Sequence, residues 1–105
     1  MKKITLNDEA LPRDVIDDLR EFEKILRRYG AEKIILYGSL ARGDYRVDSD
    51  IDLCYEGIPA YDYFRVLAEC ILQAHRRFNL TDLKTARGYF RERILNEGKF
   101  LYGSR

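Results

Sequence analysis

The stretch from residue 38 to residue 53 limits the possible folds more than any other part of the chain. It joins a turn of small residues, Gly38 and Ser39, to the densest set of carboxylates in the sequence. An apolar, β-branched run at 34–37 leads into the turn, as expected of a buried strand. The sequence therefore predicts a strand, a tight turn and a second strand, with polar side chains gathered between them.

Asp50 and Asp52 lie at the start of the second apolar alternation. In an extended backbone the period of two places them on one face and Ile51 and Leu53 on the other, with the two carboxylates roughly 6.5–7 Å apart. Like charges at this spacing repel, and Mg²⁺ is the hard cation that prefers carboxylate oxygens and substrate phosphates.

A turn that opens a helix at Gly38 and Ser39 also offers free N–H groups to a phosphate. The anion site and the cation site are thus neighbours in the sequence. This pairing is what phosphoryl or nucleotidyl transfer requires, because such catalysis depends on positioning and on neutralising charge around phosphorus.

Length and charge narrow the remaining possibilities. A chain of 105 residues predicts one domain, 1–105, with a polar N-terminal segment at 1–11. Nineteen basic and eighteen acidic side chains leave a net charge of +1, so there is no strong nucleic-acid signal. Cys54 and Cys70 are expected to be reduced, buried thiols. Without a signal-peptide pattern or a membrane-length apolar run, we expect a cytoplasmic protein with no membrane contact.

Hydrophobic periodicity and breaker residues predict a small α/β (α+β) domain. The segments expected to be helical are 12–29, 39–42, 60–78 and 87–97. The segments expected to be extended are 33–37, 50–56 and 79–85, with a short extended piece at 4–6 and a terminal strand or packed tail at 99–102. His75 is expected to pack in the core on an apolar helix face that also carries Phe64, Leu67, Ile71, Ala74 and Phe78.

Arg42 admits two interpretations: a contact to nucleotide phosphates, or an ion pair with Asp44 or Asp48, which are themselves expected to be turn residues. Gly38 and Gly43 have the glycine spacing of a P-loop. Asp44 and Tyr45, however, replace the lysine and hydroxyl that this motif needs, so a P-loop is excluded.

The string Gly38-Ser39-x-Ala41-Arg42-Gly43, followed by Asp50-Ile51-Asp52-Leu53, resembles the signature of the DNA polymerase beta-like nucleotidyltransferase superfamily. Within it, the short chain resembles the minimal nucleotidyltransferases, the antitoxin partners of HEPN-domain toxins. The late string Ile94-Leu95-x-Glu97-Gly98-x-x-Leu101-Tyr102 is similar to the family's ending. The resemblance implies a nucleotidyltransferase fold, a small mixed β-sheet with helices packed mainly on one face and the carboxylates grouped on the other.

The resemblance also implies roles for the matching residues. Gly38 and Ser39 would hold the triphosphate of ATP, with Arg42 as a further nucleotide contact. Asp50 and Asp52 would bind two Mg²⁺ ions, joined by a third carboxylate on the following strand. Asp82 is the only carboxylate on that predicted strand, so it is expected to be a metal ligand or the general base. The alternative for Asp82 is a solvated residue at a strand end.

The activity implied is transfer of AMP from ATP to a tyrosine of a HEPN-type toxin, which the transfer would inactivate. A chain this short must borrow an acceptor-binding surface, so a hetero-oligomer or a homodimer is expected. One alternative is an antitoxin that neutralises its partner by contact alone. Another is nucleotidyl transfer to RNA or to a small molecule, which the short chain and the near-neutral charge disfavour.

Overall fold

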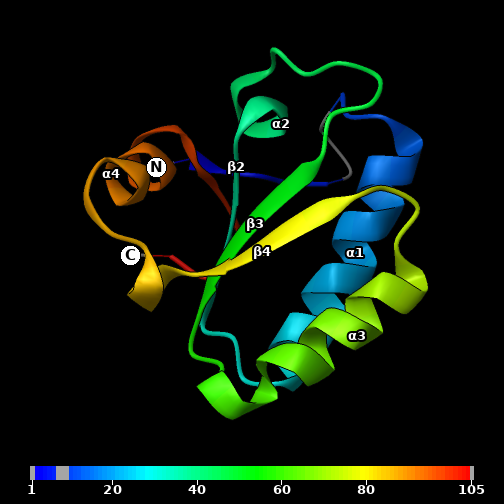
Figure 1. Ribbon diagram of the computed structural model, residues 1–105. Coiled ribbons are helices and arrows are strands. Elements are labelled where there is room, and N and C mark those ends of the chain that lie inside the picture. Colours follow the sequence, from blue (N-terminus) through cyan, green and yellow to red (C-terminus); the bar gives the residue numbers. More distant parts are fainter. Residues whose placement is uncertain (1, 7–9, 105) are drawn as a thin grey trace.

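The computed structural model describes residues 2–6 and 10–104 (Figure 1). In this part of the chain, strands and helices alternate after a short first strand. The elements are β1 (Lys2–Lys3), α1 (Arg13–Arg28), β2 (Lys33–Tyr37), α2 (Ser39–Arg42), β3 (Ile51–Glu56), α3 (Tyr63–Gln73), β4 (Phe78–Asp82), α4 (Gly88–Glu97) and β5 (Lys99–Tyr102), with 3₁₀ turns η1 (Ala60–Asp62) and η2 (Leu83–Thr85).

The strands form one mixed sheet in the order β1-β5-β2-β3-β4. β3 is antiparallel to β2 and parallel to β4, and β4 is an edge strand. α1 and α3 lie side by side against one face of the sheet, while α4 lies toward the other face and α2 beyond the end of β2 (Figure 1). The predicted fold class, a small mixed sheet with helices mainly on one face, is confirmed.

The two faces of the sheet carry separate cores. The larger core holds the apolar residues of α1 together with Leu36, Ile51 and Leu53 of the central strands. The smaller core, under α4, includes Cys54 and Ile94. Because Asp52 lies between Ile51 and Leu53 in β3, its side chain leaves the sheet on the α4 side.

Both cysteines are free and buried, as the sequence predicted. Burial raises the pKa of Cys54 and of Cys70 to about 12, so both thiols stay protonated at neutral pH. Neither is a reactive thiolate.

Helix α3 differs from its prediction. It ends at Gln73 rather than at residue 78, and it buries Val66 and Cys70, whereas Phe64 is 79% exposed and Ile71 is 59% exposed. The segment carries apolar residues on two sides, so periodicity alone cannot say which side meets α1. The predicted apolar face was therefore wrong for Phe64 and Ile71, while Leu67 does pack against the core.

His75 was also predicted wrongly. It lies beyond the end of α3, and its side chain is 64% exposed and contacts the buried Asp18. The chain has already left the helix at Ala74, whose backbone is extended, so His75 does not pack in the core.

Most other boundaries agree with the sequence to within a residue or two. β2 and α2 have the predicted bounds, and 99–102 forms a strand, β5. β4 begins at Phe78 and ends at Asp82, so the predicted strand at 79–85 gives way to η2.

At the N-terminus, β1 pairs with β5, and the N–H of Ile4 donates to the Phe100 carbonyl oxygen at 2.8 Å. The strand is thus at Lys2–Lys3 rather than at the predicted 4–6. Residues 1 and 7–9 of the predicted polar segment lie outside the described residues. No helix in the described ranges is long and apolar enough to cross a membrane.

Candidate active site

The Gly38 turn lies directly against Asp52. Gly38 has a φ of 77°, a left-handed backbone conformation that favours glycine, and a Cβ at this position would collide with Oδ2 of Asp52. α2 follows at once. The first N–H groups of this helix have no acceptor within the helix and are available to a ligand. Gly43 then ends α2 in the αL conformation, as predicted. The structure thus brings together the predicted phosphate turn and one of the predicted metal ligands.

Asp52 is partly withdrawn from water. Burial raises the pKa of its carboxyl, a hydrogen bond from Asn79 lowers it, and the charge of Asp50 raises it again. The Asn79 Nδ2 donates to Oδ1 of Asp52 at 2.8 Å. A desolvated carboxylate next to a second carboxylate is a position where a bound cation would relieve electrostatic repulsion.

Asp50 lies just before β3, which begins at Ile51 rather than at the predicted residue 50. Its carboxylate forms an ion pair with Arg77, whose Nε lies 3.2 Å from Oδ1. The backbone here is held by the N–H of Ile51, which donates to the Arg77 carbonyl oxygen at 3.0 Å. The segment before β4 therefore fixes both the position and the charge balance of Asp50.

Asp82 does not join this pair, contrary to the prediction. In the parallel register Asp52 is beside Asn79, whereas Asp82 is beside Tyr55. This places Asp82 three residues further along the strand, about 10 Å away by strand rise, and on the opposite sheet face with Leu80. Its carboxylate accepts the N–H of Lys84 at 3.0 Å and so caps η2.

Arg42 lies at the mouth of the site and is ion-paired. Its Nη1 lies 2.9 Å from Glu97 of α4, and its Nε lies 3.3 Å from the Asp44 carboxylate. Of the two interpretations of Arg42, the structure contains the ion pair, and the guanidinium also lines the cleft next to Ser39. Asp44 is highly exposed in the loop, in agreement with its predicted turn role.

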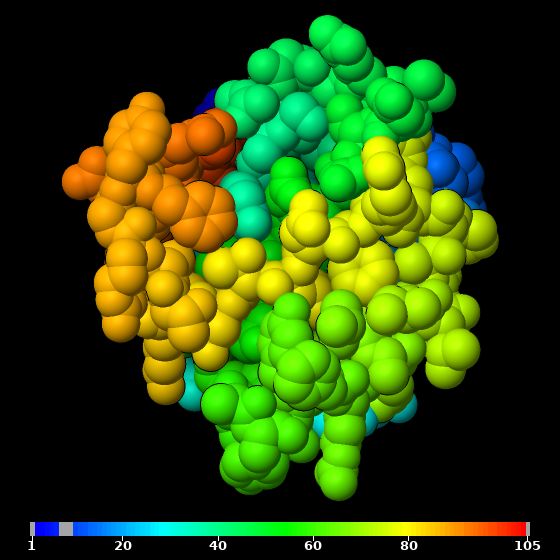
Figure 2. Space-filling view, viewed as in Figure 1, coloured from blue at the N-terminus to red at the C-terminus, as the bar shows by residue number. Residues whose placement is uncertain are grey.

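These residues surround a cleft of about 540 Å³ between α2, α4 and the strands β3 and β4. In Figure 2 the cleft lies between the orange side chains of α4 and the teal side chains of α2. Its size is within the usual range for small-molecule sites. The lining residues are Tyr37, Gly38, Ser39, Arg42, Asp52, Asn79, Thr81, Phe90, Arg93 and Glu97.

Sequence reasoning missed Asn79 and Thr81, the two β4 side chains on this face. The sequence did carry a signal for them. Phe78 and Leu80 are the apolar residues of this strand and face the core, so the residues that alternate with them must face the other side of the sheet. The search for a third carboxylate directed attention to Asp82 instead. Phe90 was also missed as a site residue; its ring makes an edge contact with Tyr37 at 5.9 Å between centroids.

A second cleft of similar size, about 540 Å³, borders the first at the β4 edge. Asn79 lines both clefts, and Asp50 and Arg77 line the second. Its far wall is more apolar and comes from α3, including Leu67 and Ile71.

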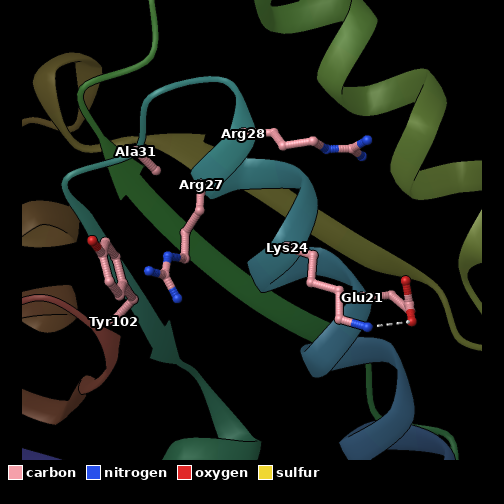
Figure 3. A pocket seen from close by; sticks show the side chains of 6 residues that line it. All are labelled: Glu21, Lys24, Arg27, Arg28, Ala31 and Tyr102. Atoms are coloured by element: carbon pink, nitrogen blue, oxygen red, sulfur yellow. Dashed lines mark hydrogen bonds and ion pairs between the residues drawn. The ribbon is translucent and has the colours of Figure 1, made fainter.

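A larger cleft, about 690 Å³, lies elsewhere, at the C-terminal end of α1 (Figure 3). Its basic side chains are already paired: Lys24 with Glu21 at 3.4 Å, Arg27 with Glu23 at 3.2 Å and Arg28 with Glu69 at 2.9 Å. The Arg27 guanidinium also stacks over the Tyr102 ring, 4.1 Å from its centroid. Size alone therefore does not make this cleft the candidate site.

The donor atoms at the site suit Mg²⁺ only in part. Asp50 and Asp52 offer the carboxylate oxygens that this ion prefers. Within residues 2–6 and 10–104, however, no cluster of three or more His, Cys, Asp or Glu side chains is arranged to hold a metal ion. The residues thus fit a cation that completes its coordination with substrate phosphates and water, which is the common arrangement for Mg²⁺.

Comparison with known proteins points in the same direction. The family described as polymerase beta, nucleotidyltransferase matches residues 20–105. A protein of Methanocaldococcus jannaschii named "Putative protein adenylyltransferase MJ0604" is 34% identical over 98 residues, which cover 80% of this chain and 94% of that protein.

Solved structures share the fold. A chain of a toxin–antitoxin complex with AMP-PNP superposes with a TM-score of 0.70 at 22% identity, covering 83% of this chain and 74% of that one. A chain of the complex of a tri-AMPylated Shewanella oneidensis HEPN toxin with an MNT antitoxin gives 0.64 at 20% identity, covering 83% and 71%. A structure described as a "putative minimal nucleotidyltransferase" gives 0.63 at 25% identity, covering 76% and 85%.

Proposed function

The chain belongs to the polymerase beta nucleotidyltransferase family, and on this premise we propose that it transfers AMP from ATP to a tyrosine of a HEPN-type toxin partner in a magnesium-dependent reaction. In this role it acts as an antitoxin, in a complex with the toxin it modifies. A homodimer is the alternative assembly. We also propose a cytoplasmic location, where free cysteines such as Cys54 and Cys70 are the rule.

The observation that carries the proposal is the contact between the Gly38 turn and Asp52. This contact places the proposed phosphate-binding turn directly beside the proposed metal-binding carboxylate. Both line a cleft whose volume suits a nucleotide. We assign triphosphate binding to Gly38, Ser39 and Arg42, and cation binding to Asp50 and Asp52.

The chemistry is a single displacement at the α-phosphorus of ATP. The tyrosine oxygen forms a bond to this phosphorus while the bond to the bridging oxygen breaks. Pyrophosphate leaves with that electron pair, and the tyrosine proton is released to solvent. When bound, Mg²⁺ supplies charge neutralisation at the attacking and leaving oxygens.

The chain's own residues supply position and charge. The first-turn N–H groups of α2 orient the phosphates, and the Arg42 guanidinium adds a positive charge at the cleft mouth once phosphate competes with Glu97. Asp50 and Asp52 would hold the cation, whose charge would help to position the donor phosphates against the Gly38 turn.

The choice of a protein acceptor rests on the relatives. The Methanocaldococcus jannaschii relative is named as a putative protein adenylyltransferase. One of the complexes that contain a chain of the same fold also contains a HEPN toxin that carries AMP. The near-neutral net charge of +1 gives no broad basic surface for RNA as the acceptor.

The direct test is incubation of the purified protein with labelled ATP, Mg²⁺ and a folded HEPN-type partner. We expect label on the partner, at a tyrosine identified by mass spectrometry, and release of pyrophosphate. Chelation of Mg²⁺ should abolish the label. A correctly folded partner that stays unlabelled would contradict the proposal.

The competing function is neutralisation by contact alone. The variant with Asp50→Asn and Asp52→Asn separates the two, because it removes the cation site while keeping side-chain size. Adenylyl transfer predicts that this variant loses labelling and toxin neutralisation together. If the variant no longer labels the toxin but still neutralises it fully, the contact mechanism would be favoured.

A further inference from the structure

The side chain beside Asp52 on the neighbouring strand is an amide. In the parallel β3–β4 register, residue 52 is beside residue 79, and both side chains leave the sheet on the α4 side. A carboxylate at position 79 would complete a group of three around the Gly38 turn. The chain has Asn79 there, while the nearest carboxylate in β4, Asp82, lies on the other face.

Asn79 is built into the site rather than merely near it. Its Nδ2 donates to Oδ1 of Asp52 at 2.8 Å, and the residue lines both neighbouring clefts. Its amide oxygen is a neutral donor that a hard cation accepts, but it adds no negative charge.

The surrounding charges also balance. Asp50 is paired with Arg77, and Glu97 is paired with Arg42 and with Arg93, at 2.9 and 3.4 Å. Asp50 and Glu97 are thus already paired with arginines, while Asp52 has the neutral Asn79 amide as its hydrogen-bond partner, so a free divalent cation meets little unpaired negative charge beyond Asp52. A cation that arrives bound to a triphosphate brings its own negative ligands, and those phosphates also compete for the arginines.

We propose that Asn79 is the third side chain of the cation site, and that its neutral amide makes the site take up divalent cations together with the nucleoside triphosphate rather than before it. This inference rests on the proposed function, since it describes the same site. It concerns the order of binding and can be measured without any transfer reaction.

The first experiment uses the wild-type protein. Mn²⁺ binding is followed by electron paramagnetic resonance, in the absence and in the presence of a saturating non-hydrolysable ATP analogue, with the analogue's own Mn²⁺ binding subtracted. We expect weak binding alone and binding at least about tenfold tighter with the analogue, because coupling between two ligands is reciprocal. Equally tight Mn²⁺ binding without nucleotide would overturn the proposal.

The second experiment adds charge at position 79. Asn79→Asp should strengthen Mn²⁺ binding in the absence of nucleotide by about tenfold or more, since charge count tunes the affinity of such sites. The same variant should gain thermal stability on Mn²⁺ addition, a readout that also reports whether it is folded. Unchanged Mn²⁺ affinity in a folded Asn79→Asp variant would count against the assignment.

Asp82→Asn is the matched control. Because Asp82 caps η2 and Asn can keep that hydrogen bond, the variant should fold normally and bind Mn²⁺ and nucleotide as the wild type does. Weakened Mn²⁺ binding in Asp82→Asn would transfer the third position to Asp82. Loss of AMP transfer with these metal results intact would instead refute the proposed function and leave the role of Asn79 standing.

Discussion

At the scale of single residues, the site depends on a missing side chain. Gly38 must be glycine for two separate reasons: its φ is 77°, and a Cβ would collide with Oδ2 of Asp52. The close approach that this absence permits places the Gly38 turn, proposed to bind phosphate, against Asp52, the carboxylate proposed to bind the cation.

Gly38→Ala should therefore displace Asp52 and lower AMP transfer by more than about tenfold, the effect of misplacing a reacting group. The left-handed φ should also cost on the order of 1–3 kcal/mol of stability, as measured by denaturant unfolding. Gly43→Ala is the control, because it has the same kind of φ, 92°, but nothing within 4 Å of the added Cβ. Equal transfer rates in the two variants would show that the Asp52 contact is unimportant.

At the scale of elements, one buried carboxylate joins the helical layer to the site. Asp18 of α1 is fully buried and accepts the N–H groups of His75 and Arg76 at 2.8–3.0 Å and the His75 Nδ1 at 2.7 Å. Arg76 then donates to the carbonyl oxygen of Ser49 at 3.0 Å, just before Asp50. The loop between α3 and β4 thus ties α1 to the start of β3.

Asp18→Asn should destabilise the fold by about 1–3 kcal/mol, because an amide turns a donor toward buried N–H groups that need acceptors. For a domain of this size, thermal denaturation should register a fall of roughly 4–8 °C for each kcal/mol. Asp17→Asn provides the control, since the Asp17 side chain is much more exposed than that of Asp18 and is paired with Arg13, 3.2 Å away on the surface. A similar small effect from both substitutions would mean that the buried carboxylate does not organise the loop.

At the scale of the whole molecule, the same contact makes stability depend on pH. The hydrogen bond and charge of Asp18 raise the pKa of His75 above its ordinary value. A raised histidine pKa stabilises the folded state fully below the unfolded pKa, about 6.5, and this contribution is lost as the pH rises through the folded pKa. The midpoint of thermal unfolding should therefore exceed that of His75→Gln at pH 5.5, and the difference should shrink by pH 8.5. A constant difference across this range would rule out the charged pair.

How far the sequence predicts this molecule depends on whether a feature is local. β2, α2 and the Gly43 cap follow from neighbouring residues and were predicted with their bounds. Asp82 was misplaced because its face depends on how β4 pairs with β3, which no local pattern states. The sequence did contain one indication. Leu80 is apolar and lies on the same face of β4 as Asp82, so this face is the one that packs against the larger core and not the one that carries Asp52.

α3 failed for a related reason. Its apolar residues cover two sides of the helix, and only packing against α1 decides that Val66 and Cys70 are buried while Phe64 stays exposed. Recognition of the central motif was secure because it needs only spacing, whereas the third position of the site needs a register between strands.

The position of β4 at the edge of the sheet affects how ligands can reach the candidate site. Asn79 lies between the cleft beside Gly38 and Ser39 and the second cleft, which runs along the sheet edge toward α3. A small donor entering the first cleft and a bulky acceptor crossing the second would meet from opposite sides of one side chain. In-line displacement needs attacking and leaving oxygens on opposite sides of phosphorus. Under the proposed function, the sheet edge would give the macromolecular acceptor an entry route separate from that of the nucleotide.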